Sequence, residues 1–296
     1  MLTPRPYQEE AHENFVNRIH AVQRGGLIVL PTGAGKSLQM GMAIDWWLKN
    51  GKGGVGIVSH RKELVRQNAD EYDELVGRPG ACIKEQGSDH RADLNDWERV
   101  RAGGVISFTV QTLQNRRLMK VSRDAIGLLC VDEAHRIKNQ GQYDKVREYF
   151  NCKWVGLTAT PDRTDGQKLV GPMFDECWYG DKKGQLLPDF IRDGWLTPFK
   201  VMPVHVAGLD WKRLKGRSGK DFTNEQVSKV WKDYETIYRF ISPIIKEVGD
   251  RKTLYFCPEV KQAKDVADVI NATSAPRVVA DYVASYRIDE EGNRSD

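Results

Sequence analysis

Two short segments of the chain carry residues whose types and spacing suit phosphate chemistry. Residues 27–37 read LIVLPTGAGKS, and residues 126–135 read IGLLCVDEAH. Each is an apolar run that ends in polar residues, a pattern that favours a buried strand with reactive side chains at its carboxyl end. The first segment supplies a lysine and a hydroxyl beside glycines, and the second supplies adjacent carboxylates. Together these groups could hold a nucleoside triphosphate, a magnesium ion and an attacking water.

The glycine-containing loop predicts a cradle for phosphate groups. Gly33 and Gly35 let the backbone turn tightly and direct its N–H groups toward phosphate oxygens at the start of a helix. Lys36 is placed to reach the outer phosphates, and Ser37 is placed to bind Mg²⁺ through its hydroxyl. The pattern departs from GxxxxGK[ST] at its first position, where Leu30 stands in place of glycine. The residues expected to surround the triphosphate are Pro31, Thr32, Gly33, Ala34, Gly35, Lys36 and Ser37.

The acid pair predicts a metal ligand and a catalytic base. Asp132 follows a buried strand and is placed to hold Mg²⁺, whereas Glu133 is placed to orient and deprotonate a water molecule. The alternative is that both are surface acids that favour the start of the next helix. Their position after an apolar strand, downstream of a phosphate loop, favours the catalytic interpretation.

The elements that must position these groups alternate along the first two thirds of the chain. Alternation of strands with helices predicts an α/β fold with a parallel sheet covered on both faces. Ligands are then expected at the carboxyl ends of the strands. We expect strands at residues 26–30, 54–59, 104–109, 126–131 and 154–158, and helices at residues 37–49, 62–75, 93–102 and 143–150.

The pattern changes after Trp195. The elements expected there are a strand at 197–206, a basic loop at 209–221, a helix at 224–248 and a strand–helix pair at 252–257 and 259–271. Pro243 is expected to kink or break the helix that contains it. The strand–helix pair is interpreted as the start of a second α/β domain. The expected domains are therefore residues 1–196, residues 197–250 as a linker with an accessory strand and helix, and residues 251–296.

The composition indicates the cellular compartment and limits the kinds of binding partner. The net charge is +4, from 45 basic and 41 acidic residues, which only weakly favours a polyanionic partner. The five cysteines are widely spaced without a CxxC pair, so we expect a reducing, cytoplasmic setting without disulfides or a zinc site. No uninterrupted apolar run approaches membrane-spanning length, and no membrane partner is expected. Cys130, Trp46 and Trp47 are interpreted as core residues.

The sequence resembles superfamily 2 helicases and translocases. LPTGAGKS at residues 30–37 and VDEAH at residues 131–135 are similar to motifs I and II of that superfamily. Further blocks in the family's order are RPYQ at 5–8, VSHRKELVRQ at 58–67, TVQTL at 109–113, LTATPDR at 157–163 and FIRDGWLT at 190–197. The likeness is to the branch that contains repair and transcription helicases, phage recombination helicases and type I restriction motors.

The resemblance implies a RecA-like P-loop NTPase domain that uses ATP and Mg²⁺. It also implies DNA as the partner, with RNA less favoured, in a bacterial or phage-infected cell. Arg5 and Gln8 match the adenine-recognising element. Within the acid segment, Glu133 is implied as catalytic together with Lys36 and His135.

Further residues match blocks that connect the nucleotide to the nucleic acid. Thr158 and Thr160 are implied to couple the nucleotide state to strand binding, together with the histidine of motif II. Arg61, Gln111 and Thr112 are implied to contact the nucleic-acid backbone, which gives little sequence preference. The simpler alternatives are that the threonines satisfy hydrogen bonds at a strand end and that the arginine is a solvated residue at a helix start.

The resemblance also implies a second RecA-like domain, of which residues 251–296 resemble only the opening. The later blocks of the family, which carry the arginine fingers, are not found in the sequence. A missing finger costs on the order of 10³–10⁵ in turnover, so slow hydrolysis is expected from this chain alone. A second polypeptide could supply the rest. The alternatives are an ATP-gated nucleic-acid-binding subunit that needs a partner chain for turnover, and a degenerate remnant without activity.

Overall fold

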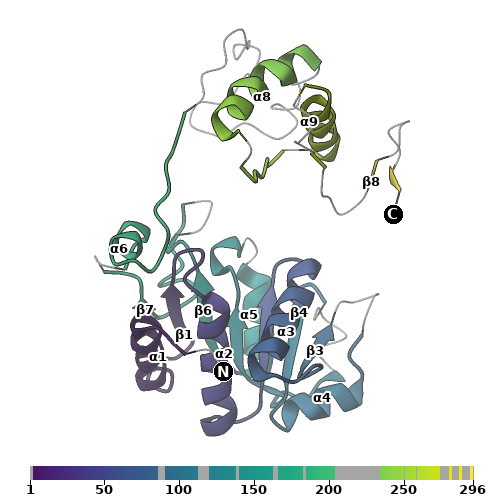
Figure 1. Cartoon of the computed structure of the whole chain (residues 1–296). Helices are drawn as coiled ribbons and strands as arrows, with labels where there is room; N and C mark the ends of the chain where they lie inside the picture. Colours follow the sequence, from purple (N-terminus) through teal and green to yellow (C-terminus); the bar gives the residue numbers. More distant parts are fainter. Residues whose placement is uncertain are drawn as a thin grey trace. The chain divides into compact units, whose positions relative to one another are not determined.

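The computed structural model describes residues 3–85, 91–112, 120–137, 140–162, 166–182, 185–203, 234–249, 251–257, 259–273, 280–281, 287–288 and 294–295. The chain divides into two compact units, Met1–Pro198 and Phe199–Asp296 (Figure 1).

The first unit contains a seven-stranded sheet in the order β3-β4-β2-β5-β6-β1-β7, and its described strand pairs are parallel. The expected α/β fold is therefore confirmed. The order places β6 between β5 and β1, so the loops that follow β5 and β1 leave the same sheet edge on either side of β6. The strands are β1 (Gly25–Val29), β2 (Gly54–Ser59), β3 (Cys82–Glu85), β4 (Val105–Thr109), β5 (Ile126–Val131), β6 (Lys153–Thr158) and β7 (Glu176–Tyr179).

Helices cover both faces of this sheet (Figure 1). Successive strand side chains point to opposite faces, so Leu27 enters one apolar cluster and Ile28 the other. The Ile28 cluster includes side chains from α1, α2, α3 and α6, whereas the Leu27 cluster includes side chains from α4 and α5. The helices are α1 (Pro6–Arg18), α2 (Lys36–Asn50), α3 (Lys62–Val76), α4 (Leu94–Arg101), η2 (Ala134–Arg136), α5 (Gln140–Phe150) and α6 (Leu187–Arg192).

The residues interpreted from the sequence as core residues do lie in this core. Trp47 is buried, and the ring of Trp46 packs edge-on against Phe15 with 5.5 Å between the ring centroids. Cys130 lies fully inside β5, where burial raises the pKa of its thiol. A thiol held in its neutral form packs as a small apolar side chain.

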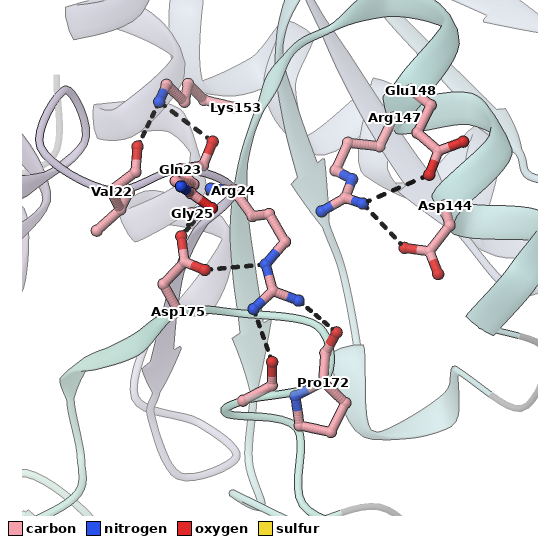
Figure 2. Close-up of polar contacts among 11 residues, drawn as sticks. Val22, Gln23, Arg24, Gly25, Asp144, Arg147, Glu148, Lys153, Pro172 and Asp175 are labelled. Carbon is pink, nitrogen blue, oxygen red and sulfur yellow. Dashed lines mark hydrogen bonds and ion pairs between the residues drawn. The ribbon is translucent and has the colours of Figure 1, made fainter.

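Arg24, a partly buried residue directly before β1, links the start of β1 to the loop before β7. Figure 2 shows Arg24 directed at the carboxylate of Asp175 and at the carbonyl oxygen of Pro172. Arg24 donates from Nε to Asp175 Oδ1 at 2.9 Å, and its backbone N–H donates to Oδ2 at 2.6 Å. The guanidinium also donates to the carbonyl oxygens of Pro172 and Gly171, at 2.6 and 2.7 Å. These bonds hold an edge strand that pairs along one side only.

Asp175→Asn is expected to lower the free energy of unfolding by about 2 kcal/mol at neutral pH, the scale of a hydrogen bond to a charged group. Burial opposes ionisation of Asp175, but hydrogen bonds from Arg24 and Gly25 outweigh it and hold its pKa below the ordinary 3.8. A depressed pKa adds stability above the ordinary pKa, and this stability is lost as the pH falls through the folded-state value. Urea unfolding should therefore show a wild-type advantage at pH 7 that shrinks below about pH 4. An advantage that stays constant with pH would contradict this.

The second unit is built on a helix pair. Its α8 (Tyr234–Val248) and α9 (Val260–Thr273) pack through an apolar cluster of Ile237, Ile241, Val266, Val269 and Ile270. Two short strands, β8 (Arg287–Ile288) and β9 (Arg294–Ser295), pair antiparallel. None of the described helices is long and apolar enough to cross a membrane.

In the region after Trp195 that the structure describes, two expected strands are wrong and an expected helix break does not occur, whereas the alternative of a kink at Pro243 stays a prediction. Residues 197–203 and 252–257 form no strand. A strand needs a neighbour to receive its backbone hydrogen bonds, and neither segment pairs with another in the described part of the chain. The helix does not break at Pro243, because α8 runs through it and packs Ile237 and Ile241 against α9. Residues 204–206, the basic loop at 209–221 and the expected helical residues 224–233 lie outside the described residues.

Candidate active site

The loop between β1 and α2 has the backbone that its glycines predict. Gly33 and Gly35 have φ angles of +87° and +77°, in the left-handed region where glycine is favoured. A side chain at Gly35 would also collide with Gln8, whose Nε2 would lie 2.6 Å from the added Cβ. Gly35 forms the N-cap of α2 without a side-chain hydrogen bond. The first N–H groups of α2 therefore lack a side-chain cap, as an anion site at a helix start requires.

Side chains of α1 form hydrogen bonds to the backbone of this loop. Gln8 is buried and donates from Nε2 to the carbonyl oxygens of Ala34 and Gly35, at 3.1 and 3.2 Å. Its Oε1 accepts the backbone N–H of Arg5 at 2.9 Å. Tyr7 donates its hydroxyl to the Ala34 carbonyl at 3.0 Å. The Gln8 amide group is thus hydrogen-bonded to the phosphate loop and to Arg5. Adenine recognition by Arg5 and Gln8 stays a prediction.

The acid pair lies at the carboxyl end of β5. Burial, followed by the charge of neighbouring Glu133, raises the pKa of Asp132 against an opposing hydrogen bond from Asn68. Asn68 Nδ2 donates to Asp132 Oδ2 at 3.1 Å, and the Glu133 N–H donates to Oδ1 at 2.9 Å. Glu133 has a φ of +47°, an unfavourable left-handed conformation for a residue other than glycine. Such strain is typical of functional sites, where the surrounding structure fixes the conformation.

The phosphate loop and the acid pair meet across the end of β6. Lys36 Nζ lies 3.7 Å from Glu133 Oε1, and both side chains are largely shielded from solvent. Lys36, Ser37, Asp132 and Glu133 line one pocket of about 130 Å³. The remaining described lining residues are Met40, Leu64, Gln67, Asn68, Glu71 and Leu157. Of the residues predicted to surround the triphosphate, only Lys36 and Ser37 line this pocket; Pro31, Thr32, Gly33, Ala34 and Gly35 form the loop beside it.

The donor set suits a hard divalent cation. Magnesium prefers oxygen ligands and is commonly held by one or two carboxylates together with substrate phosphates. Ser37 Oγ and the Asp132 carboxylate supply oxygen atoms within the pocket, and the nearby Glu71 and Glu133 carboxylates add negative charge. The residues present therefore fit the predicted Mg²⁺, with Ser37 and Asp132 as the side chains that would hold it.

His135 lies between Glu133 and the end of β6. His135 Nδ1 lies 2.9 Å from Thr158 Oγ1 and 3.3 Å from Glu133 Oε2. The Thr158 hydroxyl donates to the Thr160 carbonyl at 3.0 Å, so Nδ1 of His135 is assigned as the donor to Thr158. Burial lowers the pKa of His135, although Glu133 acts in the opposite direction. The structure thus brings together the three predicted coupling residues, His135, Thr158 and Thr160.

Thr158→Val is expected to lower the free energy of unfolding by about 1–2 kcal/mol, because it removes the acceptor of a partly buried His135 N–H. Thr158→Ser keeps the hydroxyl and serves as the matched control. Urea unfolding at neutral pH measures both variants. A valine variant as stable as the wild type would show that the hydroxyl does not stabilise the histidine.

The predicted nucleic-acid contacts lie on neighbouring strand ends. Arg61 follows β2 and forms the N-cap of α3, while Gln111 and Thr112 follow β4, which pairs with β2. The side chains of Arg61 and Gln111 are exposed, whereas Thr112 donates its hydroxyl to the Thr109 carbonyl at 2.7 Å. Their contact with a nucleic-acid backbone stays a prediction. Leu113 and Arg163, the last residues of two of the matched blocks, lie outside the described residues.

Sequence reasoning missed the contribution of α3. Gln67, Asn68 and Glu71 project from this helix into the pocket. Gln67 ends the block at residues 58–67 but was given no role, and Asn68 and Glu71 lie outside every matched block. Their spacing places them on one helix face, which is the signal that could have identified them.

Comparisons with known proteins agree with this geometry. A family model described as "Type III restriction enzyme, res subunit" matches residues 1–163. The Type I restriction enzyme EcoAI endonuclease subunit of Escherichia coli is 25% identical over 284 residues, 88% of this chain and 33% of the relative. The DNA 3'-5' helicase XPB of Kineococcus radiotolerans is 24% identical over 283 residues, 90% of this chain and 45% of the relative. The chain thus spans less than half the length of either relative.

Solved structures share the fold. The helicase domain of Pyrococcus furiosus Hef aligns with a TM-score of 0.52 and 23% identity, over 91% of this chain and 53% of that chain. The Type ISP restriction-modification enzyme LlaBIII, bound to DNA, aligns with a TM-score of 0.59 and 17% identity, over 91% and 21% of the two chains. At these identities the likeness establishes the fold alone.

Proposed function

Because the chain belongs to the type III restriction enzyme res subunit family, within superfamily 2 of the helicases, we propose that it binds ATP with Mg²⁺ and hydrolyses ATP while contacting the DNA backbone. The family match confirms the resemblance predicted from the motifs. The observation that carries the proposal is the 3.7 Å approach of Lys36 Nζ to Glu133 Oε1 above one pocket that also contains Ser37 and Asp132.

Four residues of the pocket and the loop beside it have roles in this proposal. The backbone of the β1–α2 loop and Lys36 bind the phosphates, with the free N–H groups of α2 adding to the attraction. Ser37 and Asp132 hold Mg²⁺, which would neutralise charge on the phosphates. Glu133 orients the attacking water and accepts its proton. The pairing of Lys36 with Glu133 keeps this carboxylate directed toward the phosphate-binding side.

DNA is the proposed polymer because the E. coli and K. radiotolerans relatives are named as a restriction subunit and a DNA helicase. Arg61 and Gln111 are proposed to contact its phosphates, since both are exposed at one sheet edge. His135 bridges Glu133 and Thr158, so it is proposed to transmit the state of the nucleotide toward residues that follow β6.

Steady-state ATP hydrolysis by the purified chain, with and without single-stranded DNA, tests the proposal. We expect slow, Mg²⁺-dependent hydrolysis that DNA stimulates, and loss of the stimulation in Arg61→Ala with retention of ATP binding. A chain that binds ATP and DNA but hydrolyses ATP only when a partner polypeptide is added would instead be an ATP-gated binding subunit. A folded chain that binds no ATP analogue would overturn both assignments.

A further inference from the structure

The hydroxyl of the phosphate-loop serine is directed at an acid that no motif contains. Ser37 Oγ donates to Glu71 Oε2 at 2.5 Å, across the gap between α2 and α3. Glu71 lies on the third turn of α3 and lines the same pocket as Lys36 and Asp132. The carboxylate that contacts Ser37 is therefore that of Glu71. Asp132, the other predicted metal ligand, accepts hydrogen bonds from Asn68 and from the Glu133 N–H instead.

Neighbouring side chains of α3 hold both carboxylates in place. Gln67 Nε2 donates to Glu71 Oε1 at 2.8 Å, which leaves Oε2 for Ser37. Asn68 is buried and donates to Asp132 Oδ2 and to Ser59 Oγ, at 3.1 and 2.9 Å. One face of α3 thus orients an acid of its own and the acid at the end of β5.

The charges in the pocket are unbalanced toward the negative. Among the described residues that line it, Glu71, Asp132 and Glu133 carry carboxylates, and Lys36 is the one cation. Lys36 lies against Glu133, so the other two acids face the pocket without a cationic side chain from its lining. Three carboxylates and one ammonium group give the lining a net negative charge, which makes a cation the ligand that this arrangement favours.

We propose that Glu71 is a positioning residue for Mg²⁺, a role that rests on the proposed ATP–Mg²⁺ site. Its carboxylate accepts a hydrogen bond from the Ser37 hydroxyl. The O–H group then points toward Glu71, and the lone pairs of Ser37 Oγ stay available to the metal. Its charge adds to that of Asp132 in attracting the cation. Residues that orient metal ligands in this way commonly contribute 10- to 100-fold to metal affinity.

The test compares Glu71→Gln with Glu74→Gln, which removes the same charge from an exposed position on the same helix. Calorimetry measures ATPγS affinity for each protein with excess Mg²⁺ and with EDTA. We expect Glu71→Gln to weaken binding about 10-fold with Mg²⁺ but not in EDTA, where removing a negative charge cannot weaken the binding of an anion, while Glu74→Gln behaves as wild type in both conditions. In a Ser37→Ala background, Glu71→Gln should have a smaller further effect, because the part that acts through the Ser37 hydrogen bond is already lost and only the contribution of its charge remains.

The outcomes separate this inference from the function on which it rests. If the wild-type chain fails to bind Mg²⁺–ATPγS, the proposed ATP site itself is wrong. If the wild-type chain binds and Glu71→Gln matches Glu74→Gln, only the role of Glu71 is overturned. A Glu71→Gln protein that melts at lower temperature and loses affinity equally in Mg²⁺ and EDTA would assign Glu71 to structural support of α2 and overturn its role toward the metal.

Discussion

Lys36→Ala is expected to weaken ATP binding about 100-fold, the upper scale for losing a hydrogen-bonded charge. Lys36 is the one cation among the described residues that line the pocket. Without it, a triphosphate would face Glu71, Asp132 and Glu133 with no positive side chain between them. The acids would then repel the ligand that the lysine attracts.

Calorimetry with ATPγS and Mg²⁺ measures this effect, and thermal unfolding without nucleotide checks that the variant folds. Lys49→Ala is the matched control, because Lys49 lies on the same helix, is exposed and pairs only at the surface with Asp45. The control should keep wild-type affinity. Equal affinity in Lys36→Ala and wild type would end the assignment of the phosphate loop.

Glu133→Gln is expected to keep ATP binding and to slow hydrolysis by about 10²–10⁴, the usual contribution of a positioned general base. The substitution preserves the shape of the side chain and removes its charge. A φ of +47° is equally unfavourable for glutamate and glutamine, so the substitution leaves the backbone strain unchanged and tests the carboxylate alone. Loss of the charge near Lys36 should, if anything, leave the lysine freer to bind phosphate.

Rapid-quench single-turnover hydrolysis with saturating ATP measures the chemical step, and calorimetry measures binding. Glu148→Gln is the control, since Glu148 is exposed on α5 and its ion pair among the described residues is a long contact with Arg147, at 3.9 Å. Hydrolysis by Glu133→Gln at the wild-type rate would assign the catalytic base to another residue.

The central strands could be predicted closely because they are buried on both faces. The expected bounds of β2 and β5 agree with the structure, since each is a continuous apolar run between polar residues. The edge strands β3 and β7 are short, and their sequences CIKE and ECWY lack such a run. Their strand conformation depends on pairing with β4 and β1, which the local sequence does not encode.

The segment at 252–257 shows the opposite error. Its sequence KTLYFC has the composition of a strand, yet Leu254 and Phe256 are 84% and 93% exposed while Tyr255 and Cys257 pack on the α8–α9 cluster. One face is therefore covered, but the described residues supply no neighbouring strand. Composition could not predict whether a partner for its backbone is present.

The residues of the site likewise fall into those that the sequence could place there and those that it could not. The proximity of Lys36, Ser37, Asp132 and Glu133 was predictable, because each follows an apolar strand and the carboxyl ends of parallel strands share one sheet edge. Glu71 was not predictable, because a helix presents polar residues to solvent and to a site alike. Only the packing of α3 beside α2 places this carboxylate on the Ser37 hydroxyl.

The most direct test of the shared ATP–Mg²⁺ site is a crystal structure of the chain with Mg²⁺ and a non-hydrolysable ATP analogue. We expect the triphosphate to lie on the N–H groups of residues 33–37. We expect the metal about 2.1 Å from Ser37 Oγ, with Asp132 bound directly or through water. A triphosphate bound elsewhere, or a metal that contacts neither Ser37 nor the Asp132 side of the pocket, would contradict the shared site.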